Sequence, residues 1–500
     1  MPKRAAVFLD RDGTLIEDVG ILDTPRNVRI LPDTVEALLL LQKKYALFVV
    51  TNQSGIAQGR VTADQVDEVN THLDEMLSRE GIEIHEWYVC PHRREDQCSC
   101  IKPKSGFILE AARGYQLDLH ASFVIGDHPH DTLTANEYGV FGLYVLTGHG
   151  ARHLAELPLD KLVFHRILDA AEWIMKHPAG QQSLTNSIQQ AAEQIRRGKT
   201  VVFPTETVYG LGADAFNAAA VSRIFEIKKR PLDNPLIVHI SDPEQVAMLT
   251  DSRSKEAEKL MKAFWPGPLT LVFPKKESVP DVVTSGSKTV AVRLPENLIA
   301  QELIRTAGTP LAAPSANAFS CTSPTAAKHV QDQLGEEVEG LIDGGSCRVG
   351  VESTVLSFTG RGPEILRPGG ITAEQIEAVI GPVHTQGSPT SGPAESPGLL
   401  PYHYAPKTPL ALYAEIPREI ADEPDVGIML MNESEVHFAG PVELLSPRGT
   451  LSEVSRNLYA AMHRLDALGL RLIAVQRAPN QGLGRALNNR LKKASAGRAV

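Results

Sequence analysis

Short apolar runs alternate with helical patterns over the first 180 residues, and this alternation limits the fold more than any other feature of the chain. Apolar runs of three to five residues suit buried strands and are too short for helices. Strands that alternate with helices in this way form a parallel sheet covered by helices on both faces. The predicted strands are residues 5–9, 47–50, 87–89 and 123–125, and the helices between them include 33–44 and 62–79. We therefore predict an α/β domain over residues 1–180.

The predicted helix 62–79 has signals at both ends. Thr62, with Gln65 three residues later, matches a capping box, in which each of the two side chains accepts a hydrogen bond from the backbone N–H of the other residue. Gly81 follows the helix as a C-terminal stop. The apolar residues between these signals fall on one face, namely Val66, Val69, Leu73, Met76 and Leu77. One apolar face is what a helix that lies on a sheet requires.

A second domain, residues 183–382, has shorter β-type runs separated by proline-containing turns. It opens with a predicted helix at 187–197, which Gly198 ends. The predicted strands are residues 201–203, 236–240, 269–273 and 290–292. We expect this central domain to contain a twisted mixed sheet rather than a purely parallel one.

A linker separates this domain from the rest of the chain. Of the fourteen residues 385–398, eleven are Gly, Pro, Ser or Thr, a composition typical of connecting segments, and we place the linker at 383–407. Beyond it, the predicted strands are residues 410–413, 426–431 and 472–475, and the predicted helices are 452–468 and 484–493. We therefore expect residues 408–500 to form a small, Rossmann-like α/β domain. We also expect the parallel sheet of residues 1–180 to be Rossmann-like.

Composition excludes several classes of protein. The chain carries 50 basic and 60 acidic residues, a net charge of −10, so we expect no tight binding of nucleic acid through bulk charge. Residues 471–500 are an exception, with seven Lys or Arg and no acidic residue, and they are either a solvated helix face or a contact for RNA. No apolar run approaches the length of a membrane helix, and the N-terminal apolar stretch ends too early for a signal peptide, so we expect a cytoplasmic protein with no membrane contact. Five cysteines imply no disulfide framework.

Polar side chains follow the predicted strands of the first domain. Asp10 and Asp12 come directly after the first strand, and Gly13 permits a tight turn there. The later strands and turns supply Thr51, Asn52, Lys102 and Asp127. Because ligands bind at the carboxyl ends of strands in such sheets, these side chains share one crevice. One carboxylate could attack phosphorus, a second could move a proton, and the remaining groups could hold a phosphate and a magnesium ion.

This constellation resembles the haloacid-dehalogenase-type phosphatases. The resemblance implies that Asp10 is a nucleophile that forms an aspartyl-phosphate and that Asp12 is the general acid and base. It also implies that Thr51 and Lys102 hold the phosphoryl group and that Asn52 contacts the substrate.

The same resemblance implies a magnesium ion bound by Asp10, Asp127 and the backbone carbonyl of Asp12. The substrate would be a phosphorylated small molecule. His128 and His130, which follow Asp127, either touch that substrate or are solvent-facing loop histidines, and we expect the latter.

A cluster of thiols and one imidazole narrows the resemblance. The cluster contains Cys90, His92, Cys98 and Cys100, four residues of the types that bind a structural zinc ion tetrahedrally. It resembles the zinc loop of heptose-bisphosphate and histidinol-phosphate phosphatases. Ile101 stands where the heptose enzymes usually have an arginine, so the substrate, whether a sugar bisphosphate, histidinol phosphate or another phosphate ester, stays open.

The central domain contains no G-x-x-x-x-G-K-[ST] sequence, so a nucleotide there must bind without that loop. Four separated cations in a net acidic chain suggest an anion-binding cavity instead. These cations are Lys228, Arg230, Arg293 and Arg367. Surface salt bridges are the alternative that composition alone favours.

These positions lie in strings that resemble the YrdC-like threonylcarbamoyl-AMP synthases, in the longer form with a C-terminal domain. The characteristic set is Lys228, Arg230, Ser315 and Asn317, and the resemblance continues through His403 and Tyr404. It implies that ATP, with magnesium, contacts Lys228, Arg230, Asn234, Ser315, Asn317, Ser323, Arg367 and Tyr404. It implies that L-threonine contacts Thr207, His239, Arg293 and Ser353, with Arg293 pairing the carboxylate and Tyr404 acting as a lid.

The implied reaction converts L-threonine, bicarbonate and ATP into threonylcarbamoyl-AMP and pyrophosphate for threonylcarbamoyladenosine formation in tRNA. The product would pass to tRNA-modifying protein partners that bind transiently. We therefore expect a bifunctional enzyme, a nucleotidyltransferase fused to a phosphatase. Two alternatives stay open, a non-catalytic regulatory role for the phosphatase-like domain and an RNA-binding role for the synthase-like one.

Overall fold

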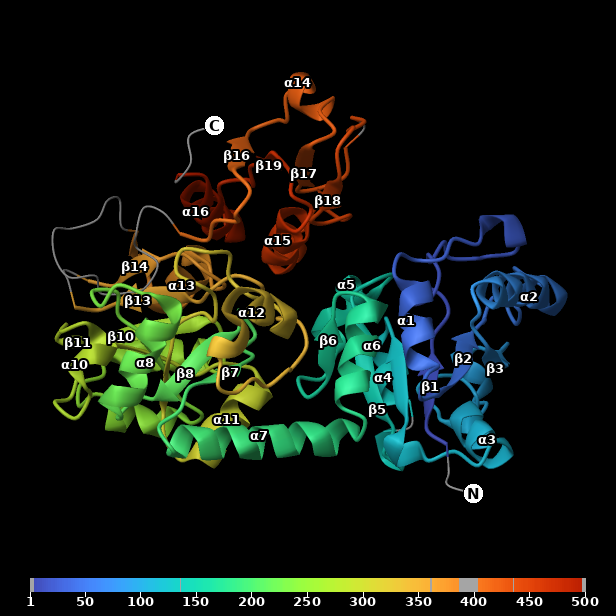
Figure 1. Ribbon diagram of the computed structural model, residues 1–500, viewed down its shortest axis with the longest axis horizontal. Coiled ribbons are helices and arrows are strands. Elements are labelled where there is room, and N and C mark those ends of the chain that lie inside the picture. The colour runs from blue at the N-terminus through green and yellow to red at the C-terminus, as the bar shows by residue number, and fades with distance from the viewer. Residues whose placement is uncertain (1–3, 135, 360–361, 386–402, 435, 497–500) are drawn as a thin grey trace. The chain divides into compact units, whose positions relative to one another are not determined.

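The computed structural model describes residues 4–134, 136–359, 362–385, 403–434 and 436–496 (Figure 1). The chain divides into two compact units, Met1–Asn186 and Ser187–Val500. Most of the predicted linker, residues 386–402, lies outside the described residues.

The first unit contains a six-stranded sheet in which every pair is parallel, as predicted. Its strands are β1 (Ala6–Leu9), β2 (Ala46–Asn52), β3 (Ile84–Cys90), β4 (Phe123–Gly126), β5 (Phe141–Val145) and β6 (Leu162–Phe164). The order β3-β2-β1-β4-β5-β6 is Rossmann-like. The order reverses between β1 and β4, and ligands of doubly wound sheets bind at the carboxyl ends of the strands on either side of such a reversal.

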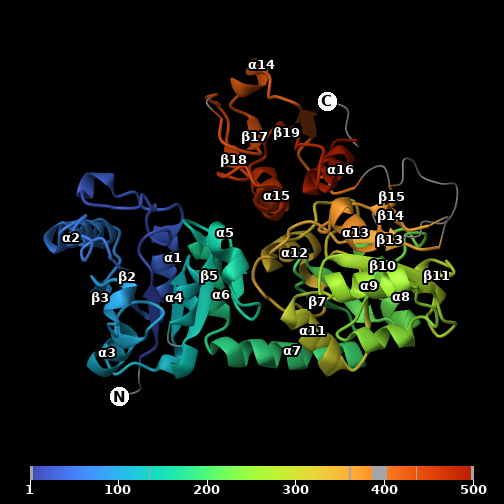
Figure 2. The same ribbon diagram turned by 180° about the vertical axis from the view of Figure 1, so that it is seen from behind.

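Helices cover the sheet of the first unit. They are α1 (Thr34–Leu41), α2 (Ala63–Arg79), α3 (Gly106–Gly114), α4 (Pro129–Leu133), α5 (Gly150–His153) and α6 (Ile167–Lys176). The capping box of Thr62 and Gln65 is present at the start of α2. Helices α1 and α6 lie side by side in both views (Figures 1 and 2). The ring of Trp173 on α6 stacks on Phe141 of β5, which anchors that helix to the sheet.

Helix α7 (Gly180–Arg196) begins seven residues before the predicted start at 187. No proline or glycine interrupts residues 181–196, so nothing in this stretch stops the helix from extending backwards. The two units part between Asn186 and Ser187, inside this helix.

The second unit contains the predicted mixed sheet, with nine strands among the described residues. They are β7 (Val201–Phe203), β8 (Gly210–Asp214), β9 (Ile237–His239), β10 (Leu269–Pro274), β11 (Thr289–Arg293), β12 (Leu311–Ala313), β13 (Thr354–Ser357), β14 (Glu364–Arg367) and β15 (His384–Thr385). The order is β15-β14-β13-β10-β11-β9-β12-β8-β7, with parallel and antiparallel pairs. Its helices are α8 (Ala218–Lys228), α9 (Lys255–Phe264), α10 (Asp281–Thr284), α11 (Leu298–Ala307), α12 (Ala327–Leu334) and α13 (Ala373–Ile380).

The last part of this unit is a small parallel sheet with helices, as predicted. Its strands, in the order β16-β19-β17-β18, are β16 (Leu410–Tyr413), β19 (Leu472–Gln476), β17 (Val426–Leu430) and β18 (Val442–Leu444). Its helices are α14 (Arg418–Ala421), α15 (Leu451–Asp466) and α16 (Leu483–Ser495). Its apolar core is continuous with Val208, Val351 and Tyr404, so this C-terminal domain packs directly against part of the preceding domain.

Among the described residues, no helix has both the length and the apolar character needed to cross a membrane.

Candidate active sites

Three buried carboxylates meet at the carboxyl ends of β1 and β4. Asp10 follows β1 directly, Asp127 follows β4, and Asp131 lies on α4 four residues later. One carboxylate oxygen of each lies within 4.8 Å of the others. The switch in strand order brings these side chains together, as the sequence predicted for Asp10 and Asp127. The prediction missed Asp131, which reaches this group from the short helix α4 that follows Asp127.

Lys102 places its ammonium group between two of these carboxylates. Its Nζ contacts the carboxylate of Asp10, lies 2.6 Å from that of Asp131, and donates to the Val50 carbonyl at 3.0 Å. The Asn52 side chain accepts the backbone N–H of Lys102 at 3.1 Å. Asn52, predicted to contact substrate, therefore holds the lysine loop in the described structure.

The electrostatics of this group favour a bound cation. Burial, aided by the neighbouring carboxylates, raises the pKa of Asp127 to about 9, and burial raises the pKa of Asp10 to about 7 despite Lys102. Three carboxylates thus share one ammonium, and an oxygen-preferring divalent ion such as Mg²⁺ would relieve their repulsion. The donor set fits magnesium.

Two glycines allow the backbone to approach the Asp127 carboxylate closely. Gly13 has φ +79°, and a Cβ there would lie 2.1 Å from the Asp127 carboxylate. Gly148 has φ +51°, and its Cβ would lie 2.3 Å from the same oxygen. The next backbone N–H, of His149, donates to Asp127 at 2.6 Å. Gly13 therefore has the left-handed conformation that the predicted tight turn needs.

Asp12 lies beside this group with its own partners. Its carboxylate accepts bonds from the buried Arg11 guanidinium at 2.9–3.1 Å and from Gln53 Nε2 at 2.8 Å. The hydroxyl of Thr51 donates to it at 3.4 Å. Arg11 is itself held by Asn70 at 2.7 Å. The sequence analysis singled out neither Arg11, although it adjoins Asp12 in the chain, nor Gln53, which lies 41 residues from Asp12.

We expected His128 and His130 to be solvent-facing loop histidines, but both rings have polar partners in the structure. The His128 ring caps α4 by accepting the backbone N–H of His130, and the His130 ring lies 2.9 Å from an Arg94 nitrogen. Both are half-buried, and burial lowers the pKa of His128 to about 4. Pro129 at the first helical position and the Asp131 carboxylate, which accepts the backbone N–H of His128 at 2.9 Å, complete the start of this short helix.

The predicted zinc ligands converge. The Cys100 Sγ lies 3.2 Å from Cys90, 3.4 Å from Cys98 and 3.3 Å from Nδ1 of His92, and Cys90 lies 3.7 Å from Cys98. A tetrahedron with zinc–sulfur bonds of 2.3 Å has edges of about 3.8 Å, so these four atoms need only a small expansion to bind zinc. The donor set fits a structural site, two residues before Lys102.

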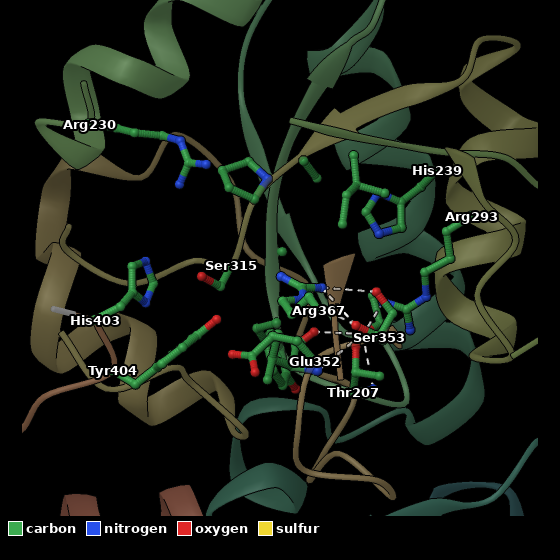
Figure 3. Close-up of a pocket in the computed structure, with 17 residues that line it drawn as sticks. Thr207, Arg230, His239, Arg293, Ser315, Glu352, Ser353, Arg367, His403 and Tyr404 are labelled. Atoms are coloured by element: carbon green, nitrogen blue, oxygen red, sulfur yellow. Dashed lines mark hydrogen bonds between the residues drawn. The ribbon is translucent and has the colours of Figure 1, made fainter. Parts of the chain in front are cut away.

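The second unit holds a pocket between its mixed sheet and the segment 403–404 (Figure 3). Three arginines, several hydroxyls and two buried histidines line it. Among its lining residues are Thr207, Arg230, His239, Arg293, Ser315, Glu352, Ser353, Arg367, His403 and Tyr404. The pocket is therefore cationic and polar, which suits an anionic ligand.

Arg293 and Arg367 are fixed by neighbours from other strands. Arg293 Nη1 donates to the Thr207 hydroxyl at 2.9 Å, and its Nη2 lies 2.7 Å from the buried Glu206 carboxylate. Arg367 donates to the Ser353 carbonyl at 2.9 Å and to its hydroxyl at 3.1 Å. Both guanidiniums are thus oriented before any ligand arrives.

The two histidines of the pocket are neutral. Burial, with Arg293 nearby, lowers the pKa of His239 to about 3. Burial, with Arg230 nearby, lowers the pKa of His403 to about 3. Neutral imidazoles add hydrogen-bonding atoms to the pocket without adding charge.

Sequence comparison identifies the family. The family described as "Telomere recombination" matches residues 193–369, and "Threonylcarbamoyl-AMP synthase, C-terminal domain" matches residues 371–496. The threonylcarbamoyl-AMP synthase of Bacillus subtilis is 45% identical over 325 residues, which cover 63% of this chain and 94% of the relative. That of Pyrococcus abyssi is 44% identical over 324 residues, 63% of this chain and 95% of the relative. The chain belongs to the threonylcarbamoyl-AMP synthase family.

A solved relative supports the same assignment. The Sua5 protein of P. abyssi complexed with L-threonine is 43% identical and covers 62% of this chain and 94% of that chain, with a TM-score of 0.57. The family described as HAD-hydrolase-like matches residues 99–170. The chain is thus an enzyme in which a hydrolase-like region precedes a threonylcarbamoyl-AMP synthase, the fusion predicted from the sequence.

Eight of the twelve residues predicted to contact ATP or threonine line the synthase pocket. Lys228, Asn234, Asn317 and Ser323 do not. Lys228 is buried and its Nζ donates to the carbonyls of Ser315, at 2.6 Å, and of Asn317. The backbone carbonyl of Asn234 accepts from Arg230 at 3.0 Å. In the described structure, these groups hold the walls of the synthase pocket.

Glu352 lines the pocket although it was not predicted to contact either substrate. Its carboxylate accepts hydrogen bonds from Ser323 at 2.6 Å and from Arg490 of α16 at 2.7 Å. Its neighbour Ser353 was predicted to contact threonine, but an acidic residue gives no reason to expect Glu352 in an anion pocket.

Proposed function

We propose that the second unit makes threonylcarbamoyl-AMP from L-threonine, bicarbonate and ATP for tRNA modification. The observation that carries this proposal is the pocket in which Arg230, Arg293 and Arg367 meet hydroxyls of Thr207 and Ser353, in a region 43–45% identical to synthases. Three cations suit a triphosphate and an amino-acid carboxylate together.

In this reaction the threonine amine and carbon dioxide form a carbamate, whose oxygen attacks the α-phosphorus of ATP and displaces pyrophosphate. Arg293, already aligned by Thr207, would pair the threonine carboxylate. Arg230 and Arg367 would meet the charge of the nucleotide. Catalysis would rest on orientation and on charge stabilisation, with no covalent enzyme intermediate.

The test is pyrophosphate release by the full chain with ATP and bicarbonate, with and without L-threonine. We expect release only when threonine is present. ATP turnover that is independent of threonine would contradict the proposal, and transfer to tRNA in the presence of tRNA-modifying proteins would extend it.

We also propose that the first unit is a metal-dependent phosphatase acting on a phosphorylated small molecule. This proposal is supported by the buried group of three carboxylates and one lysine, Asp10, Asp127, Asp131 and Lys102. A domain that only bound a ligand would not need a buried lysine shared by two carboxylates. Magnesium would supply charge neutralisation at the phosphoryl oxygens.

Asp10 would attack phosphorus while the bond to the leaving oxygen breaks, and Asp12 would give that oxygen a proton. Water would then hydrolyse the aspartyl-phosphate, and Asp12 would take the proton from that water. Arg11, Gln53 and Thr51 hold Asp12 within this site, and Lys102 holds Asp10.

A panel of sugar phosphates, histidinol phosphate and nucleotides, offered to the full chain with magnesium, tests this activity. We expect phosphate release from at least one compound and none from the Asp10→Asn variant. Equal release by both chains would show that the phosphatase activity does not come from this site.

A further inference from the structure

Arg490, on α16 of the C-terminal domain, contacts two residues that line the synthase pocket, Glu352 and Tyr404. It is fully buried, and its Nε donates to Glu352 at 2.7 Å. Glu352 lines the pocket beside Ser353 and Arg367 (Figure 3). The Arg490 guanidinium of the C-terminal domain therefore contacts a lining residue of a pocket that lies mainly in the preceding domain.

Two tyrosines complete the contact. The Tyr459 hydroxyl of α15 lies 3.1 and 3.2 Å from the two oxygens of Glu352. The Arg490 guanidinium lies over the Tyr404 ring, 5.0 Å from its centre, and this ring stacks on Tyr459 at 6.1 Å. Tyr404 also lines the pocket and is buried. Arg490 and Tyr459 thus hold two pocket residues at once.

The negative charge of Glu352 must be offset if the pocket is to bind an anionic nucleotide. Although burial alone would raise it, Arg490 and Arg367 lower the pKa of Glu352 to about 2, so the carboxylate is ionised at neutral pH. A buried carboxylate without a partner would oppose an anionic nucleotide and would draw Arg367 toward itself. Arg490 supplies a positive charge beside the Glu352 carboxylate, so Arg367 is not the only cation that offsets it.

We propose that Arg490 and Tyr459 are positioning residues of the synthase site, which hold Glu352 and Tyr404 in place and neutralise the Glu352 carboxylate so that an anionic nucleotide can bind. This proposal rests on the proposed synthase function. It makes the C-terminal domain a working part of the site, and it gives part of the basic segment 471–500 a buried role.

The test compares three variants of the full chain: Arg490→Met, Glu352→Gln and the double variant. Threonine-dependent pyrophosphate release is measured against ATP at saturating threonine, and then against threonine at saturating ATP. Since one unpaired charge in a partly desolvated pocket changes binding by on the order of tenfold, Arg490→Met should raise the KM for ATP by about that factor. The KM for threonine should change less.

The sign of the other two variants separates this role from a structural one. Glu352→Gln leaves a cation and no opposing anion, so the KM for ATP should not rise. The double variant has neither charge and therefore the same net charge as the wild-type pair, so its KM for ATP should fall back to about that of the wild type. A merely structural role predicts losses of kcat and thermal stability in all three variants, with the KM for ATP unchanged, and that result would overturn the proposal.

Arg485→Met is the matched control. Arg485 lies on the same helix and pairs with Glu374 of α13 at 2.9 Å, but both side chains are about half exposed, so the KM for ATP should not change. If Arg490→Met does not fold, Tyr459→Phe replaces it, because it removes one bond to Glu352 and keeps the ring. Its KM for ATP should rise about threefold for one lost hydrogen bond and return in Tyr459→Phe/Glu352→Gln, and an unchanged KM would overturn the proposal. Absence of threonine-dependent release in the wild-type chain would instead contradict the synthase function itself.

Discussion

The Nζ of Lys102 lies 2.6 Å from the carboxylate of Asp131, and the same ammonium contacts Asp10. Burial alone would lower the pKa of Lys102, but these two carboxylates raise it above its ordinary value, so the lysine stays charged. One lysine thus sets the position of the proposed nucleophile and of a proposed metal ligand together.

Replacement of Asp131 by asparagine should therefore disable the first unit. The change removes one negative charge from the metal site and one partner of Lys102, and we expect phosphate release to fall by about a hundredfold or more. Phosphate release across a magnesium titration measures the effect. Asp160→Asn, at an aspartate whose side chain is 62% exposed, is the control and should leave the rate unchanged. A rate for Asp131→Asn within twofold of the wild type would remove Asp131 from the site.

The response to pH should depend on the metal. The folded chain raises the pKa of Asp10 to about 7 and of Asp127 to about 9 from 3.8, so the stability that their protonated forms contribute is complete below about pH 4. That stability is lost as the pH rises through 7 and 9. Without magnesium, the Tm of the transition that reports the first unit should fall between pH 5 and 9.

Magnesium should raise this Tm more at pH 8 than at pH 5, because it binds the ionised carboxylates. Calorimetry with and without magnesium measures the difference, and the Asp127→Asn variant, which lacks one of these charges, should show a much smaller response. A magnesium shift of equal size at both pH values would count against this assignment.

Loss of zinc should affect the first unit alone. Cys98→Ser removes one of the four converging ligands, and we expect the bound zinc to fall and the Tm of the first unit to drop by about 5 °C or more. Elemental analysis and calorimetry measure the two effects. Cys321→Ser, outside the cluster, should keep the zinc, and threonine-dependent pyrophosphate release should survive both changes. A Cys98→Ser chain with its full zinc content would show that the metal is bound elsewhere.

Arg293 should govern threonine rather than ATP. Arg293→Gln keeps a polar side chain but removes the charge that would pair an amino-acid carboxylate, so the KM for threonine should rise by about a hundredfold. The KM for ATP should change far less. Arg305→Gln, at an exposed arginine of α11, is the control. An equal rise in both constants would mean that Arg293 supports the pocket as a whole.

Strong local patterns allowed much of the fold to be predicted. The helix that begins after Thr62 has both parts of its capping box, and strand 201–203 is observed with the predicted bounds. The short strands β8 and β12 were not predicted. β8 contains two glycines, β12 has only three residues, and both are defined mainly by their pairing with other strands.

The candidate sites show the same division. Asp10, Asp127 and Lys102 follow strands or turns that the sequence marks, and the fold brings them together. Arg490 lies 138 residues from Glu352, and Gln53 lies 41 from Asp12, so no local spacing could connect either pair. Such partners are set by packing between distant segments rather than by sequence pattern.

The central claim is that one chain carries two chemically separate active sites. Phosphate release and threonine-dependent pyrophosphate release, measured side by side on the full-length Asp10→Asn chain, test it most directly. The account predicts that phosphate release is lost while pyrophosphate release stays at the wild-type rate. Loss of both activities together, or of neither, would contradict it.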